Sequence, residues 1–276
     1  MPNLRREARA MGDATTIVQL TDLHLGAPGA LPYGTDTAAN LRRVVAAVRA
    51  MELAPAAILL TGDLSDEGDA ASYGVLRDLV DDELASIGAP VLTVIGNHDH
   101  RGMFRKVFLG EDDADDDRPY HHTTDLGDVR IVMCDSYVAG EVWGALGEAQ
   151  LTWLDEQLAG AGGRACVVAL HHPAVPRGVP RPEDHLLADR EAFGEVLARH
   201  DVAAVLCGHS HVTTMSRFAG TLHSAAPATA YLLDPSRRRG ARGYEGSGFA
   251  ICTVRDGMAI VNPYVLPPDD SELYAT

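Results

Sequence analysis

Five short polar segments hold the side chains best suited to bind metal ions or move protons. Their His, Asp and Asn residues offer imidazole, carboxylate and amide groups, a mixture that suits Mn, Fe, Zn or Co. The segments are Asp22-Leu23-His24, Gly62-Asp63, Gly96-Asn97-His98-Asp99, His171-His172 and Gly208-His209-Ser210-His211. In the first and last segments the donors are two positions apart, so in an extended chain both would point to the same side. This pattern predicts a metal site assembled from several parts of the chain.

The set of donors is large enough for two ions. It comprises seven residues, namely Asp22, His24, Asp63, Asn97, His171, His209 and His211. The Asp63 carboxylate could bridge two ions, and ions about 3.5–4 Å apart form the clamp used in phosphoryl transfer. Each segment alone has an ordinary alternative, because Asp-x-His or Gly-Asp at the end of a strand is commonly a turn. Their occurrence together at successive strand ends favours the metal interpretation.

The elements that must position these donors alternate between strand and helix. Apolar runs at 16–20, 57–60 and 90–95 predict strands, and helical spacing at 41–51 and 73–84 predicts the connections between them. This order implies parallel strands with right-handed crossovers. Ligands of open α/β sheets bind outside the carboxyl ends of the strands, and the polar segments follow those ends directly. We therefore expect the donors to converge at one edge.

The rest of the chain continues the alternation. Strands are predicted at 120–126, 129–134, 164–170, 202–207, 212–218, 249–254 and 258–265, with helices around Leu151 to Leu158 and at 188–199. No internal repeat or long linker divides the sequence. We expect one domain over residues 14–266, with flexible tails at 1–13 and 267–276.

Composition limits the possible partners and compartment. The 276 residues carry a net charge of −16, which disfavours long nucleic acids and anionic membrane surfaces. No run of 18 apolar residues occurs, so no membrane span is expected. Four cysteines lie far apart in apolar runs without a CxxC spacing, namely Cys134, Cys166, Cys207 and Cys252. Buried, reduced thiols in a cytoplasmic protein are the expected state.

The polar segments resemble the calcineurin-like metallophosphoesterase superfamily. Its pattern runs D-x-H, G-D, G-N-H-D/E, a His, and G-H-x-H, and each element is present between about residues 15 and 211. The resemblance implies a four-layer α/β/β/α sandwich. A narrower resemblance, to bacterial class III cyclic nucleotide phosphodiesterases and glycerophosphodiesterases, is carried by Gly96 to Arg101, His171-His172-Pro173 and Gln150 to Leu154.

The resemblance also implies roles for these residues. One ion would be held by Asp22, His24, Asp63 and His211, and the other by Asp63, Asn97, His171 and His209. The family pattern favours His171 over His172 as the ligand, which leaves His172 behind it or in packing. A hydroxide held by the metals would attack phosphorus, while Asn97 and His98 contact the substrate and His98 stabilises the transition state or protonates the leaving group. Asp99 would either hold the His98 ring in its useful tautomer or cap a helix near residues 102–108.

The expected activity is hydrolysis of a small phosphodiester, a 3′,5′-cyclic nucleotide or a glycerophosphodiester. A phosphomonoesterase or nucleotidase with the same metal core is the alternative, because all seven donors would be shared. A non-catalytic scaffold is disfavoured because the donor set is complete. The loops at 26–35 and 173–185 are candidates for the wall of the substrate pocket. The metal identity stays open, and the resemblance allows a homodimer.

Overall fold

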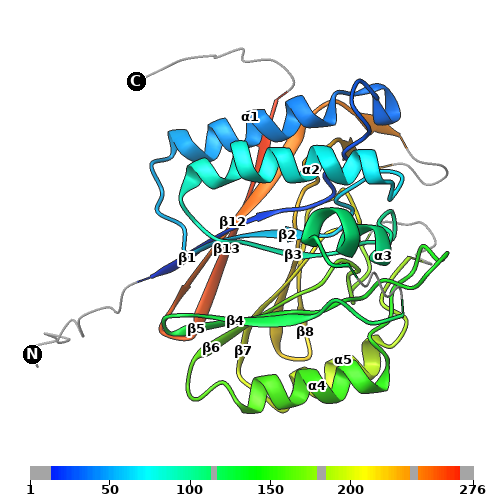
Figure 1. Cartoon of the computed structure of the whole chain (residues 1–276). Helices are drawn as coiled ribbons and strands as arrows, with labels where there is room; N and C mark the ends of the chain where they lie inside the picture. The colour runs from blue at the N-terminus through cyan, green and yellow to red at the C-terminus, as the bar shows by residue number, and fades with distance from the viewer. Residues whose placement is uncertain (1–13, 113–116, 179–184, 237–241, 268–276) are drawn as a thin grey trace, which may run out of the picture.

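Two β-sheets lie face to face between two layers of helices. The computed structural model describes residues 14–112, 117–178, 185–236 and 242–267, so the predicted tails lie almost wholly outside the described part. Helices α1 and α2 cover one sheet, and helices α4 and α5 cover the other (Figure 1). The α/β sandwich predicted from the motifs is thus confirmed.

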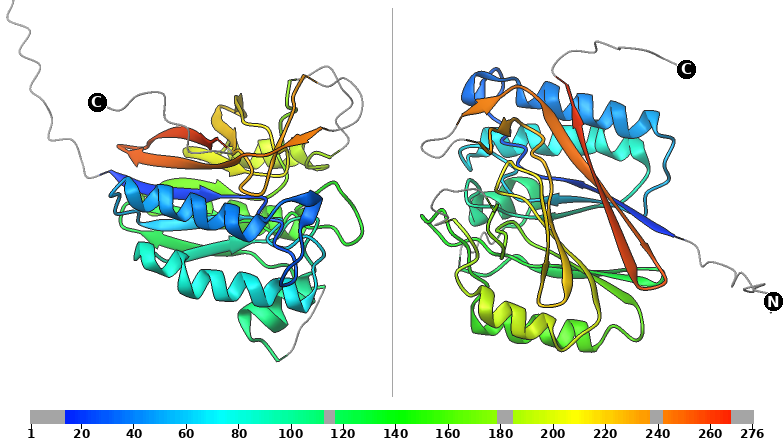
Figure 2. Two further views of the ribbon diagram at one scale, coloured as in Figure 1. Left: turned by 90° about the horizontal axis from the view of Figure 1, so that it is seen from above. Right: turned by 180° about the vertical axis from the view of Figure 1, so that it is seen from behind.

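The first sheet has the strand order β13-β12-β1-β2-β3. Its members are β1 (Thr15–Leu20), β2 (Ala57–Thr61), β3 (Val91–Val94), β12 (Ser247–Arg255) and β13 (Met258–Leu266). Strands β1, β2 and β3 are parallel to one another, as predicted, and β12 joins β1 in antiparallel fashion. The last two strands of the chain therefore return to the sheet where it began, which Figure 2 shows from behind.

The second sheet has the order β4-β5-β6-β7-β9-β8. Its members are β4 (His122–Leu126), β5 (Val129–Met133), β6 (Ala165–Ala169), β7 (Val202–Cys207), β8 (Thr214–Phe218) and β9 (Thr221–Ala225). Strand β9 was not predicted, because its sequence TLHSA has no apolar run, yet it pairs in parallel with β7 inside the sheet. The short pair β10 (Leu232–Leu233) and β11 (Gly243–Tyr244) was also not anticipated.

Helices α1 and α2 begin where an aspartate side chain accepts from a free backbone N–H group. The Asp36 carboxylate accepts from the Ala39 N–H at the start of α1 (Thr37–Ala50), and Asp69 accepts from the Ser72 N–H at the start of α2 (Ala70–Asp82). The other helices are α3 (Arg101–Met103), α4 (Gly147–Ala159), α5 (Arg190–Leu197), the 3-10 turns Pro32–Gly34 and Leu84–Ile87, and the π-helix Phe104–Leu109. None of the described helices is both long and apolar enough to cross a bilayer.

Alternation along the central strands divides the core into three zones. Ile17 of β1 and Leu59 of β2 face the second sheet and pack with Leu206 of β7. Their neighbours Val18 and Leu60 face the opposite way and pack under α1 and α2. A third zone fills the space beneath α4 and α5. Strands buried on both faces are held firmly, and their carboxyl ends become fixed points for the side chains that follow.

Candidate metal centre

The predicted donors gather where strands of both sheets end. Asp22 and His24 follow β1, Asp63 follows β2, Asn97 and His98 follow β3, His171 follows β6, and His209 and His211 follow β7. The site therefore spans two sheets, whereas the sequence indicated only successive strand ends. Gln19 ties the sheets together beneath the site, because its Nε2 donates to Thr61 Oγ1 and to the Cys207 carbonyl, each at 3.0 Å.

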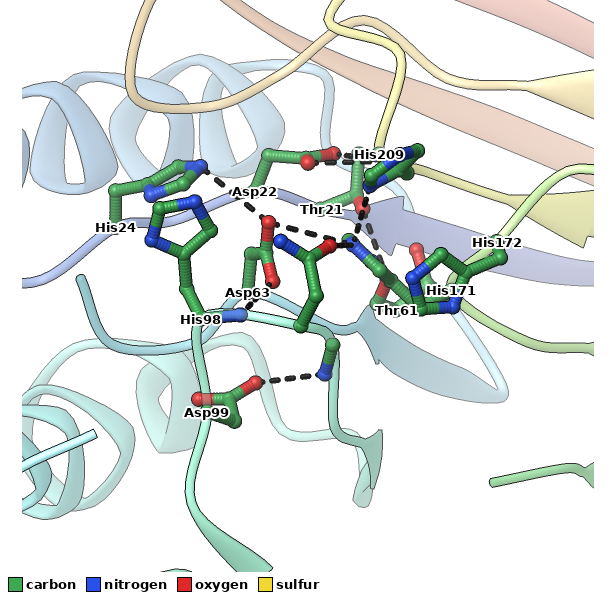
Figure 3. Close-up of polar contacts among 12 residues, drawn as sticks. Thr21, Asp22, His24, Thr61, Asp63, His98, Asp99, His171, His172 and His209 are labelled. Atoms are coloured by element: carbon green, nitrogen blue, oxygen red, sulfur yellow. Dashed lines mark hydrogen bonds and ion pairs between the residues drawn. The ribbon is translucent and has the colours of Figure 1, made fainter. Parts of the chain in front are cut away.

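The Asp63 carboxylate lies at the centre of the site (Figure 3). Its Oδ2 is 3.6 Å from His24 Nε2 on one side and 3.3 Å from His171 Nε2 on the other. Its Oδ1 accepts from the His98 backbone N–H at 2.9 Å. One oxygen thus faces two groups of donors while the other oxygen fixes the orientation of the carboxylate.

The first group of donors consists of Asp22, His24 and His211. The two Nε2 atoms of His24 and His211 are 3.1 Å apart, and His211 Nε2 is 3.3 Å from Asp22 Oδ1. Both Asp22 oxygens accept from the His209 backbone N–H, at 3.0 and 2.9 Å. All three side chains are buried, so this charge and these lone pairs need a partner within the protein.

The second group consists of Asn97, His171 and His209. Nε2 of His171 lies 3.2 Å from Asn97 Oδ1 and 3.2 Å from His209 Nδ1. His172 can join this group, because its donor atom lies within 4.8 Å of those of His171 and His209. However, Ser136 Oγ contacts His172 Nδ1 at 2.8 Å, behind the site, whereas His171 faces Asp63 directly. This placement agrees with the expectation that His171 is the inner residue.

Outer hydrogen bonds set the tautomers of three histidines. The Nδ1 atoms of His171 and His211 donate to the carbonyls of Thr61 at 2.8 Å and Tyr231 at 3.0 Å. The Nδ1 of His24 donates to Asp66 Oδ1 at 3.0 Å. In the neutral form of each ring, with Nδ1 protonated, Nε2 presents a bare lone pair to the interior. Two lone pairs at 3.1 Å repel unless a cation lies between them, so the donor set fits metal ions.

The pKa shifts in the site also indicate that its buried carboxylates need a positively charged partner. Burial raises the pKa of Asp63, but His171 and then His24 outweigh burial and hold that pKa well below its usual value. Burial lowers the pKa of His171, yet the Asp63 carboxylate raises it to about 9. The carboxylates therefore stay ionised in the interior only with a positive partner, which a metal ion supplies more strongly than a proton.

The backbone is left-handed at five of the seven predicted ligands. The φ angles are 52° at Asp22, 43° at His24, 47° at Asp63, 68° at His209 and 51° at His211. The expectation that the D-x-H and H-x-H segments are extended is thus wrong, although both donors of each pair still enter the site. Such conformations cost roughly 1–3 kcal/mol each and cluster at functional sites. Asp and His tolerate them better than most residues.

Asp99 does not play either of the roles predicted for it. Its carboxylate accepts from the backbone N–H groups of Leu64, Ser65 and Gly96 and from the Tyr73 hydroxyl, at 2.8–3.1 Å. Burial and then Asp63 raise its pKa to about 6, against the backbone donors that lower it. Asp99 therefore joins the loops after β2 and β3. The cap of α3 is His100, whose side chain accepts from the Met103 N–H.

Asp66 takes the place expected of Asp99 and was not identified from the sequence. Its backbone carbonyl accepts from His98 Nδ1 at 2.9 Å, and its carboxylate lies 3.8 Å from the same atom while it holds His24. The available signal was a carboxylate three positions after Asp63. That spacing is common in turns, so it did not distinguish Asp66 from a surface residue.

Two cavities open beside the donors. One of about 240 Å³ is lined by Asn97, His98 and His209 together with Pro173, Arg177 and His185 from the predicted wall loop at 173–185. A larger one of about 500 Å³ includes Tyr33 from the other predicted wall loop, at 26–35. Residues 179–184 lie outside the described part of the chain. Both candidate loops thus contribute to space next to the donors.

Comparison with known proteins adds a family match. A family model described as calcineurin-like phosphoesterase matches residues 15–213. The chain is 37% identical over 232 residues to a "probable cyclic nucleotide phosphodiesterase" of Rhodococcus erythropolis, covering 84% of this chain and 76% of the relative. It is 36% identical over 233 residues to a cAMP/cGMP dual specificity phosphodiesterase of Mycobacterium tuberculosis, covering 84% of this chain and 73% of the relative.

A solved structure agrees at the level of the fold. A dimetal phosphatase from Danio rerio superposes with a TM-score of 0.63 at 18% sequence identity, and the match covers 90% of this chain and 98% of that one. At this identity the likeness concerns the arrangement of sheets and helices.

Close packing explains why glycine precedes two of the donors. A Cβ at Gly96 would overlap the backbone nitrogen and the carboxylate of Asp63 and lie 2.7 Å from Cδ2 of His171. A Cβ at Gly208 would overlap Thr21 Oγ1 and lie 2.7 Å from Asp22 Oδ2. Neither glycine has a positive φ, so the requirement is space rather than backbone conformation.

Replacing Gly96 by alanine should therefore damage the site. We expect Gly96→Ala to lower the free energy of unfolding by about 1–3 kcal/mol through overpacking. Displacement of Asp63 should also reduce the metal content measured by elemental analysis. Gly74→Ala in α2 is the matched control, because a Cβ there meets nothing within 4 Å and should stabilise the helix by ~0.5–1 kcal/mol. Normal metal content and stability in Gly96→Ala would contradict the packing argument.

Proposed function

The chain belongs to the calcineurin-like phosphoesterase family, and from that membership we propose that it hydrolyses a small phosphodiester, with a 3′,5′-cyclic nucleotide as its substrate. The resemblance predicted from the motifs is thereby confirmed. The cyclic nucleotide is favoured because two relatives above 35% identity bear names with that activity. A phosphomonoesterase with the same donors is the alternative, and the choice of substrate is therefore the first test.

One observation carries the proposal of a two-metal centre. The Oδ2 atom of Asp63 lies between the buried side chains of His24 and His171, each of which belongs to one of the two groups of donors. With one oxygen facing both groups, Asp63 would be the ligand shared by two ions. A structural ion pair would need one histidine, not two groups on opposite sides.

The proposed ligands follow the two groups. One ion would be held by Asp22, His24, Asp63 and His211, and the other by Asp63, Asn97, His171 and His209. Mn, Fe, Zn and Co all suit this mixture of donors. The chemistry that such ions supply when bound is charge neutralisation at phosphate oxygens and a lower pKa for water.

The side chain of His98 is placed to act on the substrate itself. Its Nδ1 donates to the Asp66 carbonyl at 2.9 Å, which fixes the ring, and its side chain is 32% exposed. His98 and Asn97 both line the smaller cavity. We assign His98 to contact with a phosphate oxygen or the leaving oxygen, where it donates a hydrogen bond as negative charge develops. Asp66 is the positioning residue for this ring.

Hydrolysis of a panel of substrates tests the proposal. The protein is loaded with Mn²⁺ and given 3′,5′-cyclic AMP, glycerophosphoethanolamine and p-nitrophenyl phosphate, with a chelator control. We expect chelator-sensitive activity with kcat/KM highest for cyclic AMP. Preference for p-nitrophenyl phosphate would assign a phosphomonoesterase instead, and no hydrolysis with Mn, Fe, Zn or Co would exclude the proposed activity.

Removing the shared carboxylate should lower the metal content of the centre. We expect Asp63→Asn to lose at least one metal ion per chain, because the amide lacks the charge that two groups of donors share. Elemental analysis of the purified protein measures this loss. Asp125→Asn is the control, because Asp125 lies on β4 away from the site and pairs with Arg130 on β5. This variant should keep its full metal content. Full occupancy in Asp63→Asn would argue against the bridge.

Removing His98 should affect turnover without affecting metal content. We expect His98→Ala to lower kcat by ~10²-fold, the usual contribution of a general acid or a donor to the leaving group. His200→Ala, which removes a histidine paired with Asp155 outside the site, should change kcat by less than about twofold. If His98→Ala turned over like the wild type, His98 would have no part in the reaction.

A further inference from the structure

A cavity walled by three tyrosines lies next to the first group of donors. It measures about 500 Å³, within the range of roughly 300–1,000 Å³ that small-molecule sites occupy. Its walls include Tyr33, Thr35, Tyr231, Leu233, Tyr244 and Glu245. We call it the tyrosine cavity. None of these residues belongs to the predicted metal site, so the cavity needs its own explanation.

The tyrosine cavity lies beside the metal centre, and its wall residues contact the donors. The Tyr231 ring lies 4.4 Å from the His211 ring and 5.7 Å from the His24 ring, and the Tyr33 ring lies 5.9 Å from His24, all between centroids. The Tyr231 carbonyl also accepts from His211 Nδ1. Leu233 lines both this cavity and the smaller one beside His98. A ligand with its phosphate at the centre can therefore extend into the tyrosine cavity.

Two of the tyrosines that line the cavity expose much of their aromatic surface to solvent. Tyr33 is 63% exposed and Tyr244 is 48% exposed, although both are large rings that would gain from burial. Tyr33 also has a φ of 53°, a conformation that a bulky residue rarely adopts. Exposed aromatic faces at the edge of a cavity are suited to stack against a planar ligand group.

Charge determines which kind of planar group fits. Among the described residues, Glu245 is the one charged residue that lines the cavity, and Asp66 and Glu67 add negative potential at the Tyr33 hydroxyl. A second phosphate is therefore disfavoured here. A carboxylate accepts hydrogen bonds, so a neutral ring with N–H donors, such as the exocyclic amine of a purine, is favoured.

The ring geometry argues against a cage for a quaternary ammonium group. Such a cage needs several ring faces turned toward one cation, each within about 6 Å of it. The centroids of Tyr33 and Tyr231 are only 4.7 Å apart, so these rings contact each other and cannot flank a cation. The Tyr231 ring also packs against the His211 ring. The exposed rings of Tyr33 and Tyr244 in the lining remain available to a ligand.

We propose that the tyrosine cavity is the subsite for the nucleobase of a cyclic nucleotide, which stacks on Tyr33 and Tyr244 while its phosphodiester lies at the metal centre. The proposal rests on the proposed phosphodiesterase function and names the residues that select its substrate. Glycerophosphoethanolamine has no planar group that would stack on these rings. The cavity thus explains how one metal core could prefer a nucleotide.

Substitution of Tyr244 tests the subsite, because Tyr244 lies on β11 and makes no ring contact with the described metal donors. The measured quantity is the ratio of kcat/KM for 3′,5′-cyclic AMP to that for glycerophosphoethanolamine. Loss of one stacked ring should lower this ratio by about 5- to 100-fold in Tyr244→Ala. Tyr244→Phe keeps the ring and should keep the ratio, and Met258→Ala, at an exposed site on β13, is the control for surface changes.

Binding of adenosine provides a second readout that needs no hydrolysis. Adenosine carries the base without a phosphodiester, so calorimetry should detect its binding to the wild type and a matching loss in Tyr244→Ala. Ribose alone should not bind. If the wild type cleaved no diester yet bound adenosine in this way, the proposed activity would fail while the subsite would stand.

Two results would overturn the subsite. The first is an unchanged ratio in Tyr244→Ala together with no binding of adenosine. The second is selective hydrolysis of glycerophosphocholine that Tyr244→Ala abolishes, which would assign the cavity to a quaternary ammonium group instead.

Discussion

The arrangement of the site depends on two buried carboxylates whose negative charge must be stabilised. Asp22 and Asp63 lie in the interior, where an unpaired negative charge is very unfavourable. The neighbouring imidazoles of His171, His211 and His24 donate from Nδ1 to Thr61, Tyr231 and Asp66, which turns their Nε2 atoms toward these carboxylates. The arrangement suits positive charge between the donors, which metal ions would supply. The strand ends, the tight glycines and the strained loops all follow from bringing these groups within a few ångströms of each other.

Because the candidate metal centre lies between two sheets, the relative position of its donors depends on how the sheets pack together. Strands β1, β2 and β3 bring donors from one sheet, and β6 and β7 bring donors from the other. Contacts from one sheet to the other, such as Gln19 to the Cys207 carbonyl and the His209 N–H to Asp22, fix the relative position of the two edges. Since both sheets are buried on their facing sides, a shift of one against the other would disturb the whole core.

The sequence predicted the parts of the molecule that rest on local pattern. Strands β1 and β7 and the donors after them could be found because apolar runs end in His and Asp at fixed spacing. Strand β9 could not, since its polar sequence is buried only through its neighbours in the sheet. The roles of Asp66 and Asp99 depend on hydrogen bonds across 26–42 positions, which no spacing rule contains. The tyrosine cavity likewise forms from segments about 200 residues apart.

The left-handed backbone at five of the proposed ligands limits which substitutions such a protein can accept during evolution. Residues that accept this conformation readily are Gly, Asn, Asp and His. Mutations that preserve the chain path at Asp22 or His209 therefore lead mainly to Asn or Gly, which keep the loop but weaken or remove the donor. Loss of chemistry then need not entail loss of folding. We expect proteins descended from this sequence to include well-folded members that have lost the activity and function only through their surfaces.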